Sequence, residues 1–346
     1  MQAVILAGGL GTRLRPLTLN VPKPIVPIGN QPFLLRQIES LKAAGVIDIT
    51  LSLNYEPSAI ENVLGDGARF GVNLRYLIEP APLGTAGAYK FAQQFLNSST
   101  IVLNGDILTD IDLQTVTRHH QDHKSIATIV LTEVKNPSAY GLVHSDKDSK
   151  VVQFLEKPNL DEINELKINT INAGIYIFEP KVLDLIPKDT NYSFEYQLFP
   201  DLLNRKEKFH AFIASDNYWL DIGTPPRYLQ AHQDLMRGKI KNFQVERNNK
   251  FHVSDLAEID EISCLAEGCV IEKGAKIINS ILGKDVVIEK DAVVKNSVIW
   301  SRTKVFEHAS INDSIIGSDC LIGKNVFVTN GSVLGDATVI SDFSYC

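Results

Sequence analysis

The residues best suited to chemistry lie near the start of the chain, where glycines are followed by basic side chains. Residues 6–12, LAGGLGT, contain three glycines and follow a short apolar run. Arg13 comes next, and ten residues later Lys23 lies between two prolines. Glycines let a backbone approach a ligand closely, with N–H groups free to bind phosphate oxygens. This spacing therefore predicts an anion-binding loop.

The distribution of charge supports a local anion site. The first 38 residues contain Arg13, Arg15, Lys23 and Arg36 but no Asp or Glu, whereas the whole chain has a net charge of −7. A basic segment in an acidic protein indicates a specific anionic ligand. The acidic balance gives no support to nucleic-acid or membrane binding.

Two common glycine loops do not fit this stretch. A Walker A loop ends in Gly-Lys-Ser/Thr, but here the glycines are followed by Thr-Arg-Leu. A dinucleotide fingerprint needs a glycine where Leu14 stands and an acidic residue about 20 positions on. Gly29 and Asn30 occupy that region instead. A phosphate-binding loop of another type remains, and the plain alternative is a glycine turn with solvated basic side chains.

Residues 6–28, LAGGLGTRLRPLTLNVPKPIVPI, resemble the signature of the sugar-1-phosphate nucleotidyltransferases, or NDP-sugar pyrophosphorylases. The resemblance implies that this loop binds a nucleoside triphosphate, with Arg13 and Lys23 holding its phosphates. The loop residues expected to contact the nucleotide are Leu6, Ala7, Gly8, Gly9, Gly11, Thr12, Arg13 and Lys23.

Length and composition predict about two domains with sizeable cores. The chain has 346 residues, of which 44% are hydrophobic. The apolar run at its start is too short for a signal peptide, and no later stretch approaches a membrane span. The four cysteines, at positions 264, 269, 320 and 346, fit neither a zinc nor a disulfide pattern. A reducing cytoplasm is the simplest expectation.

Residues 1–237 are expected to form an α/β, Rossmann-like catalytic domain. Apolar strands alternate with helical patterns, which is typical of a mainly parallel sheet covered by helices. The expected strands are 3–6, 47–53, 72–79, 100–104 and 125–133, and the expected helices are 32–44, 58–64, 85–96 and 112–123. In such sheets ligands bind beyond the carboxyl ends of strands.

From residue 251 to 346 the periodicity changes to six. Leu265, Ile271 and Ile277 begin a series in which the first members of successive sets lie 17, 17, 17 and 18 residues apart. Three short faces per coil predict a β-helix, and resemblance to the hexapeptide-repeat family implies a left-handed one. Residues 238–250 are polar and are expected to be a linker. Trp300 replaces the glycine that ends equivalent repeat phrases, which indicates either a packing or a subunit contact.

Two aspartates follow apolar runs. Asp106 lies in the phrase IVLNGDIL and Asp221 in YWLDIGTP. Carboxylates combined with substrate phosphates commonly hold Mg²⁺, which takes few protein ligands. The resemblance implies that Asp106 and Asp221 are the metal ligands. The alternative for Asp106 is a turn or helix-capping residue.

Three further phrases resemble the sugar-phosphate site of the family. In FLEKP, the resemblance implies that Lys157 binds the sugar-bound phosphate and Glu156 a sugar hydroxyl. An ammonium group suits a phosphate, and a carboxylate suits hydroxyl donors. The phrases AYGLV and INAGIY complete this site with Tyr140, Gly141, Asn172 and Gly174.

The phrase IEPAPLGTAGA resembles the strip that holds the nucleobase. Glu79 would face the base edge, with Gly84 close to the ring. A carboxylate accepts two parallel hydrogen bonds, and guanine offers two adjacent N–H donors, whereas uracil, thymine and adenine do not. Glu79 therefore favours guanine if it points inward. Otherwise it faces solvent or pairs with an arginine.

The resemblance implies a reaction that converts GTP and mannose 1-phosphate to GDP-mannose and pyrophosphate, in a homo-oligomer that uses Mg²⁺. Three alternatives stay open. One is a thymidylyl- or uridylyltransferase acting on glucose 1-phosphate, and another is a non-catalytic subunit that senses a sugar nucleotide. The third adds acyl transfer on the β-helix, although the repeats show no coenzyme A signature.

Overall fold

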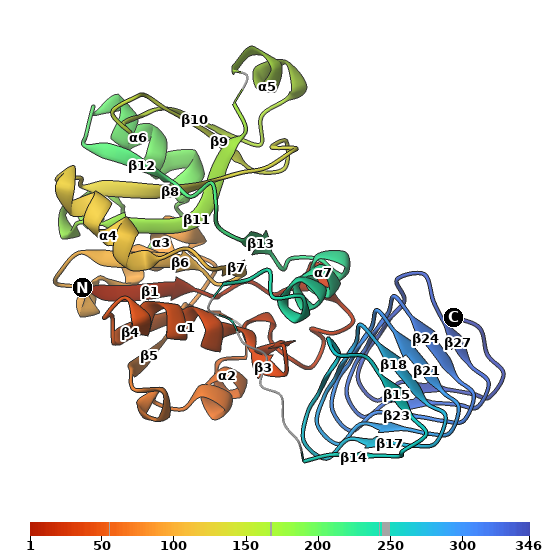
Figure 1. Ribbon diagram of the computed structural model, residues 1–346. Coiled ribbons are helices and arrows are strands. Elements are labelled where there is room, and N and C mark those ends of the chain that lie inside the picture. The colour runs from red at the N-terminus through yellow and green to blue at the C-terminus, as the bar shows by residue number, and fades with distance from the viewer. Residues whose placement is uncertain (55, 167, 242, 244–249) are drawn as a thin grey trace. The chain divides into compact units, whose positions relative to one another are not determined.

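The structure, a computed structural model, describes residues 1–346 except 55, 167, 242 and 244–249 (Figure 1). The chain forms two compact units that do not follow chain order. The first unit comprises residues Met1–Gly9 and Leu34–Trp219, and the second comprises Leu10–Phe33 and Leu220–Cys346. The segment with Arg13 and Lys23 therefore belongs to the same unit as the repeats.

A nine-stranded sheet forms the centre of the first unit. The strand order is β10-β9-β11-β6-β1-β4-β5, while β8 pairs with β11 and β12. Strands β6, β1, β4 and β5 are parallel to one another, whereas β11 runs antiparallel to β6 and β8. The strands are β1 (Gln2–Leu6), β4 (Asp48–Leu53), β5 (Asn73–Ile78), β6 (Thr100–Asn104), β8 (Ala127–Glu133), β9 (Gly141–Ser145), β10 (Val151–Glu156), β11 (Thr170–Phe178) and β12 (Phe209–Ile213).

The first unit is an α/β, Rossmann-like fold, which confirms the expected class. Its helices are α1 (Phe33–Ala43), α2 (Pro57–Leu64), α3 (Gly84–Phe91), α4 (Leu113–Asp122), α5 (Leu160–Leu166) and α6 (Phe199–Asn204). Asp112 caps α4 as expected, because its carboxylate accepts a hydrogen bond from the backbone N–H of Gln114 at 3.0 Å. Helix α1 begins one residue later than expected, since Pro32 belongs to the short strand β3 (Gln31–Pro32).

An aromatic cluster fills the core on one side of this sheet. Tyr89 from α3 contacts Phe178 from β11 and Phe194, with ring centroids 5.3 and 6.1 Å apart. Tyr176 and Phe199 extend the cluster, and all five side chains are fully buried. Large aromatic rings bury much apolar area, so this cluster anchors the strands that carry the predicted sugar-site residues.

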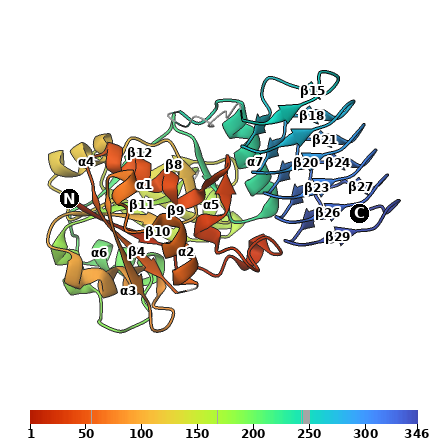
Figure 2. The same ribbon diagram turned by 90° about the horizontal axis from the view of Figure 1, so that it is seen from below.

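The repeats of the second unit form a parallel β-helix with three faces, as predicted. Each strand pairs in parallel with the strand three positions later, and Figure 2 shows the coils stacked one on the next. The coil strands are β14 (His252–Val253), β15 (Glu258–Ile259), β16 (Cys264–Leu265), β17 (Val270–Ile271), β18 (Lys276–Ile278), β19 (Ile281–Leu282), β20 (Val287–Ile288), β21 (Val293–Lys295), β22 (Val298–Ile299), β23 (Lys304–Val305), β24 (Ser310–Asn312), β25 (Ile315–Ile316), β26 (Leu321–Ile322), β27 (Phe327–Val328), β28 (Val333–Leu334) and β29 (Val339–Ile340).

The six-residue spacing follows from this geometry. Ile271, Ile277 and Leu282 each point into the coil interior from a different face and are fully buried. Corners between faces take positive φ angles, for example 47° at Asn279 and 49° at Asn296. Asn tolerates that conformation, and the two amides are linked by a hydrogen bond of 2.7 Å.

Residues 10–33 and helix α7 (Pro225–Met236) complete the second unit. The hairpin of β2 (Pro27–Ile28) and β3 lies next to the repeats, since the Asn30 amide donates to the Leu282 carbonyl at 3.0 Å. Of the expected linker 238–250, residues 242 and 244–249 lie outside the described part of the chain. Within the described residues, no helix has both the length and the apolarity needed to cross a membrane.

Candidate active site

The predicted site residues are divided between the two units. The first unit contains Leu6, Ala7, Gly8, Gly9, Glu79, Gly84, Asp106, Tyr140, Gly141, Glu156, Lys157, Asn172 and Gly174. The second unit contains Gly11, Thr12, Arg13, Lys23 and Asp221.

The carboxyl end of β1 leads into the glycine loop. The Ala7 N–H continues the ladder with β4 by donating to the Ser52 carbonyl at 2.9 Å. A Cβ placed on Gly8 would lie 3.2 Å from Oε1 of Glu79, whereas one placed on Gly9 would meet nothing within 4 Å. Gly8 is therefore held against protein, while Gly9 borders open space that can admit a ligand.

Glu79 lies at the end of β5 and points inward. Its side chain is 8% exposed, so it does not face solvent. Oε1 accepts a hydrogen bond from the Ser52 hydroxyl at 2.9 Å, and Oε2 accepts one from the Leu83 N–H at 3.2 Å. A carboxylate has about four acceptor positions, so both oxygens keep acceptor capacity. Gly84 follows and has a φ of 71°. A Cβ added to Gly84 would lie 2.7 Å from the Tyr192 carbonyl oxygen.

Asp106 lies in the turn between β6 and β7 (Ile107–Thr109), at the carboxyl end of β6. The side-chain amide of Gln37 holds both sides of this turn, donating to the Asn104 carbonyl at 2.9 Å and the Ile107 carbonyl at 3.0 Å. Gly105 is needed here because an added Cβ would lie 2.8 Å from the Leu6 carbonyl. The turn thus places Asp106, which is half-buried, beside the start of the glycine loop.

The predicted sugar-site phrases meet at the ends of β9 and β10. The Lys157 N–H donates to the Tyr140 carbonyl at 3.1 Å, which joins the two phrases. Gly141 is required because an added Cβ would lie 2.7 Å from the Phe154 ring and 2.9 Å from Oε2 of Glu156. Burial, together with repulsion from Glu195, raises the pKa of Glu156 above its ordinary value. The Glu156 side chain is half-buried, so part of it stays accessible.

Asn172 and Gly174 shape an irregular section of β11. The Asn172 amide donates to the Tyr176 hydroxyl at 2.9 Å, while its carbonyl oxygen accepts from the Gly174 N–H at 2.9 Å. Gly174 has a φ of 70°, and an added Cβ would lie 2.2 Å from Ile107 and 2.7 Å from the Asn104 amide. The amide nitrogen and the carbonyl oxygen of the Asn172 side chain thus both stabilise the bulge in β11. This bulge lies next to the turn that carries Asp106.

The sequence analysis missed two residues that the structure places at this site. Glu195 accepts a hydrogen bond from the Thr85 hydroxyl at 3.0 Å, and its charge acts on Glu156. The Trp219 indole donates to the Ala173 carbonyl at 2.9 Å, and its ring meets Tyr140 edge-on at 5.5 Å. Trp219 could have been found from its position in the YWLD phrase, but no local pattern marks Glu195.

In the second unit, Gly11 and Lys23 lie in contact. Gly11 has a φ of 63°, and an added Cβ would lie 2.9 Å from Cβ of Lys23. The Thr18 hydroxyl donates to the Gly11 carbonyl at 2.8 Å and fixes the loop. Lys23 is 9% exposed and begins the 3-10 turn Lys23–Ile25. An ammonium group at this burial needs an anionic or polar partner.

Arg13 and Asp221 lie near each other around Gly223. A Cβ placed on Gly223 would be 2.8 Å from Nη2 of Arg13 and 3.4 Å from Oδ2 of Asp221. Asp221 ends β13 (Trp219–Asp221) and forms an ion pair with Arg227 of α7. The guanidinium of Arg13 is exposed, which leaves its fork geometry accessible to a phosphate.

Two family models match the chain. A family model described as "Nucleotidyl transferase" matches residues 2–238. The chain belongs to the nucleotidyl transferase family. A second model, described as "EIF2B subunit epsilon LbH domain", matches residues 243–344 and agrees with the β-helix.

Relatives of this nucleotidyl transferase family member include proteins named for one reaction. A mannose-1-phosphate guanyltransferase from Yarrowia lipolytica is 44% identical over 66% of this chain and 62% of its own length. A mannose-1-phosphate guanylyltransferase from Mycobacterium tuberculosis is 36% identical over 80% of this chain and 76% of its own length. The match to the Yarrowia protein thus spans less than two thirds of that protein.

Two solved structures are each similar to 67% of this chain. A putative glucose-1-phosphate thymidylyltransferase from Bacillus anthracis, in complex with a sucrose, has a TM-score of 0.60 and 26% identity over 67% of this chain and 94% of that one. HddC from Yersinia pseudotuberculosis has a TM-score of 0.58 and 35% identity over 67% of this chain and 98% of that one.

The described residues of this nucleotidyl transferase contain no group of three or more His, Cys, Asp or Glu side chains arranged for a metal ion. Asp106 and Asp221 still offer hard oxygen donors, which fit a divalent ion that takes most of its ligands from substrate and water. The residue types therefore fit a metal of the Mg²⁺ kind.

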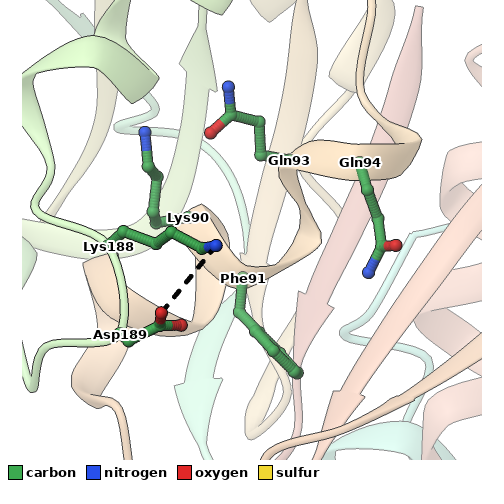
Figure 3. Close-up of a pocket in the computed structure, with 6 residues that line it drawn as sticks. All are labelled: Lys90, Phe91, Gln93, Gln94, Lys188 and Asp189. Atoms are coloured by element: carbon green, nitrogen blue, oxygen red, sulfur yellow. Dashed lines mark ion pairs between the residues drawn. The ribbon is translucent and has the colours of Figure 1, made fainter.

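A hollow outside the predicted site lies beside α3 (Figure 3). Its lining includes Lys90, Phe91, Lys188 and Asp189, and none of the predicted site residues. Lys90 donates to the Leu183 carbonyl at 2.7 Å, and Lys188 pairs with Asp189 at 3.9 Å. The hydrogen bond ties Lys90 to the fold, whereas Lys188 and Asp189 form an exposed pair at the surface.

Proposed function

We propose that this protein forms an NDP-sugar and pyrophosphate from a nucleoside triphosphate and a sugar 1-phosphate, and that it makes GDP-mannose from GTP and mannose 1-phosphate. The observation that carries the choice of nucleotide is the inward-pointing carboxylate of Glu79 beside the glycine loop. The names of the Yarrowia and Mycobacterium relatives support the same substrates.

The proposed reaction is an in-line displacement at the α-phosphorus of the triphosphate. An oxygen of the sugar phosphate forms the new P–O bond, and the bond to the β-phosphate oxygen breaks with its electron pair leaving on pyrophosphate. The attacking phosphate is already ionised, so no general base is needed. Positioning and neutralisation of charge therefore carry most of the catalysis.

The proposed phosphate binders are the basic groups and the glycine loop. Arg13, with its exposed guanidinium, would hold the β- and γ-phosphates and then the pyrophosphate. Lys23 would neutralise phosphate charge from its largely buried position. The N–H groups around Gly9, which borders open space, would bind phosphate oxygens.

Asp106 and Asp221 are the proposed ligands of Mg²⁺. This ion, when bound, supplies positive charge to the reacting phosphate. Asp106 lies in a turn fixed by Gln37, so its backbone is held in place before any ligand arrives. Asp221 is paired with Arg227, and that pairing offsets the charge of a partly buried carboxylate.

The sugar phosphate is proposed to bind at the ends of β9, β10 and β11. Lys157 would hold its phosphate, and Glu156 would accept a hydrogen bond from a sugar hydroxyl. Tyr140, Gly141, Asn172 and Gly174 would shape the site through the contacts that fix their backbones. We also propose Trp219, which is only partly exposed, as an apolar wall beside the sugar.

A second candidate is thymidylyl transfer to glucose 1-phosphate. The similarity to the Bacillus anthracis structure, whose title names that activity, favours it. Both candidates use the same phosphate chemistry and differ in the base and the sugar. The Glu79 carboxylate distinguishes the two candidates. Facing the edge of thymine, it would be repelled by two carbonyl oxygens.

The test is a pyrophosphate-release screen with GTP, ATP, UTP and dTTP against several sugar 1-phosphates. Fastest turnover with GTP and mannose 1-phosphate supports the proposal, and fastest turnover with dTTP and glucose 1-phosphate supports the second candidate. Saturable binding of a sugar nucleotide without turnover of any pair would replace both with a regulatory subunit.

Cytoplasmic location and self-association are further parts of the proposal. The cysteine spacing supports a reducing compartment. Exposed apolar side chains on the last coil, Phe343 at 77% and Tyr345 at 73% exposure, support a homo-oligomer. Light scattering on the purified protein measures the oligomeric state.

A further inference from the structure

Trp300 interrupts the glycine pattern of the β-helix. It ends the phrase NSVIW, whereas the matching phrases end in Gly283, Gly317 and Gly335. The side chain follows β22 and is 3% exposed. A large buried aromatic residue at a position otherwise kept for glycine indicates a specific contact at this coil.

That contact is with Tyr228 of α7, within the same compact unit. The indole N–H of Trp300 donates to the Tyr228 hydroxyl at 3.0 Å, and the rings meet edge-on at 6.4 Å. Tyr228 is fully buried, and its hydroxyl donates in turn to the Pro27 carbonyl. An indole N–H can only donate, so the Tyr228 oxygen accepts the hydrogen bond from Trp300. The hydroxyl hydrogen of Tyr228 is then left to donate to the Pro27 carbonyl.

His232 supports the same arrangement from the next turn of α7. Its Nδ1 contacts the Tyr228 carbonyl at 3.0 Å, and its ring lies edge-on to the Tyr228 ring at 4.5 Å. Burial lowers the pKa of His232 to about 4, which keeps the ring neutral. Tyr228 is therefore held on both sides, and it does not move freely away from Pro27.

Pro27 belongs to the segment that carries Lys23. The turn Lys23–Ile25 closes when the Val26 N–H donates to the Lys23 carbonyl at 3.2 Å, directly before Pro27 starts β2. Pro27 pairs with Pro32 in the hairpin, and Asn30 in the loop adds the second bond to the β-helix. The position of the Lys23 backbone thus depends on a contact made by the repeats.

We propose that Trp300 is a positioning residue for the triphosphate: through Tyr228 and Pro27 it holds the turn that presents Lys23. This inference rests on the proposed function only for the identity of the ligand. Loss of the indole N–H would leave the buried Tyr228 oxygen without its donor, which destabilises the hydrogen-bond chain. The hairpin would then sample positions in which Lys23 is misplaced.

A cavity beside these residues makes the proposal testable by rescue. It has a volume of about 240 Å³ and is lined by residues that include Pro27, Asn30, His232 and Trp300. Removing the indole ring would enlarge this space, since close-packed surroundings relax only in part. Added indole has the shape of the missing group and carries the same N–H donor.

The experiment compares Trp300→Phe, Trp300→Gly and Tyr228→Phe with the wild-type protein. Phe327→Ala is the control for loss of a β-helix aromatic residue outside this hydrogen-bond chain. Phe327 is 48% exposed, and its ring centroid lies 6.4 Å from that of Tyr345. Three quantities are measured: amide hydrogen exchange of residues 22–33, the GTP dissociation constant by titration, and KM and kcat with GTP.

The three variants should speed exchange at Ile25 and Val26, whose N–H groups close the turn. The GTP dissociation constant and KM should rise by about tenfold, the size expected for one lost buried hydrogen bond, while kcat stays close to wild type. Indole should restore Trp300→Gly toward wild-type exchange and binding. The control should match wild type in all three measurements.

The proposal is overturned if Trp300→Phe, which keeps the aromatic bulk, leaves both exchange and GTP binding at wild-type values. It is also overturned if kcat falls while KM and binding do not change. Failure of the proposed function would look different, since the wild-type protein would release no pyrophosphate with any substrate pair. Exchange and GTP binding would still decide the role of Trp300 in that case.

Discussion

Gly8 lies beside Glu79: a Cβ added to Gly8 would be 3.2 Å from Oε1 of the Glu79 carboxylate. The predicted phosphate loop and the predicted base-reading residue are therefore neighbours, although 71 positions separate them in the sequence. This proximity arises because β1 and β5 flank β4 in the parallel part of the sheet. Each residue limits the conformations open to the other.

Gly8→Ala and Gly9→Ala should have different effects. The methyl group of Gly8→Ala meets the Glu79 carboxylate, so the protein without ligand should lose about 1 kcal/mol of stability. Gly9→Ala meets no protein atom, so it should leave stability unchanged and weaken nucleotide binding instead. Thermal unfolding and GTP titration measure the two effects. Equal stability of the two variants would contradict the contact.

Glu79→Gln should change the choice of base. An amide presents one donor where the carboxylate presents only acceptors, so it should fit guanine less well and tolerate uracil or thymine better. The ratio of kcat/KM for GTP over UTP should fall by about tenfold, the value of one polar mismatch. Glu61→Gln, at an exposed position of α2, is the control. An unchanged ratio would remove Glu79 as the base reader.

Asp106→Asn should abolish most turnover and leave the fold intact. The amide keeps the shape of the side chain but loses the charge that a divalent ion requires. We expect kcat to fall by at least about 100-fold, in the range for loss of a group that stabilises developing charge. Circular dichroism tests the fold, and Asp122→Asn at the exposed end of α4 is the control. Undiminished turnover would refute the metal assignment.

Glu156 should make stability depend on pH in a defined direction. Its folded-state pKa is raised by burial and by Glu195, so the folded protein binds more protons than the unfolded chain above the ordinary value of 4.5. Stability should therefore fall as the pH rises through the interval between those pKa values, and then stay level.

Glu156→Gln tests this pH dependence because it cannot ionise. Compared with wild type, it should flatten the dependence of the unfolding temperature on pH above 4.5 and raise stability at neutral pH. Unfolding is followed in a series of buffers of constant ionic strength. Parallel curves for the two proteins would show that the charge of Glu156 is not destabilised in the folded state.

Local patterns in the sequence were sufficient for much of the fold. The six-residue apolar period predicted a three-faced β-helix because each face must bury one side chain per coil. Alternating strands and helices predicted the α/β sheet, and Asp112 marked the start of α4. The antiparallel pairing of β11 with β6 was not predicted, since strand direction leaves no mark on hydrophobic periodicity.

The residue types of the candidate site were also readable from the sequence, because glycines, basic groups and aspartates lie in compact phrases. Whether Glu79 points inward depended on Ser52 and Leu83, which only the folded sheet brings to it. The raised pKa of Glu156 comes first from burial, which only the folded chain provides, and then from the charge of Glu195, a residue without a local motif.

The sequence by itself determined the repeating architecture, since that follows from short-range spacing, and it supplied the residue types of the candidate site. The tertiary structure decided that residues 10–33 join the β-helix unit and that Trp300 reaches Tyr228. Those two residues are 72 positions apart. Contacts of this kind depend on how whole elements pack, and side-chain packing is not encoded in the spacing of neighbouring residues.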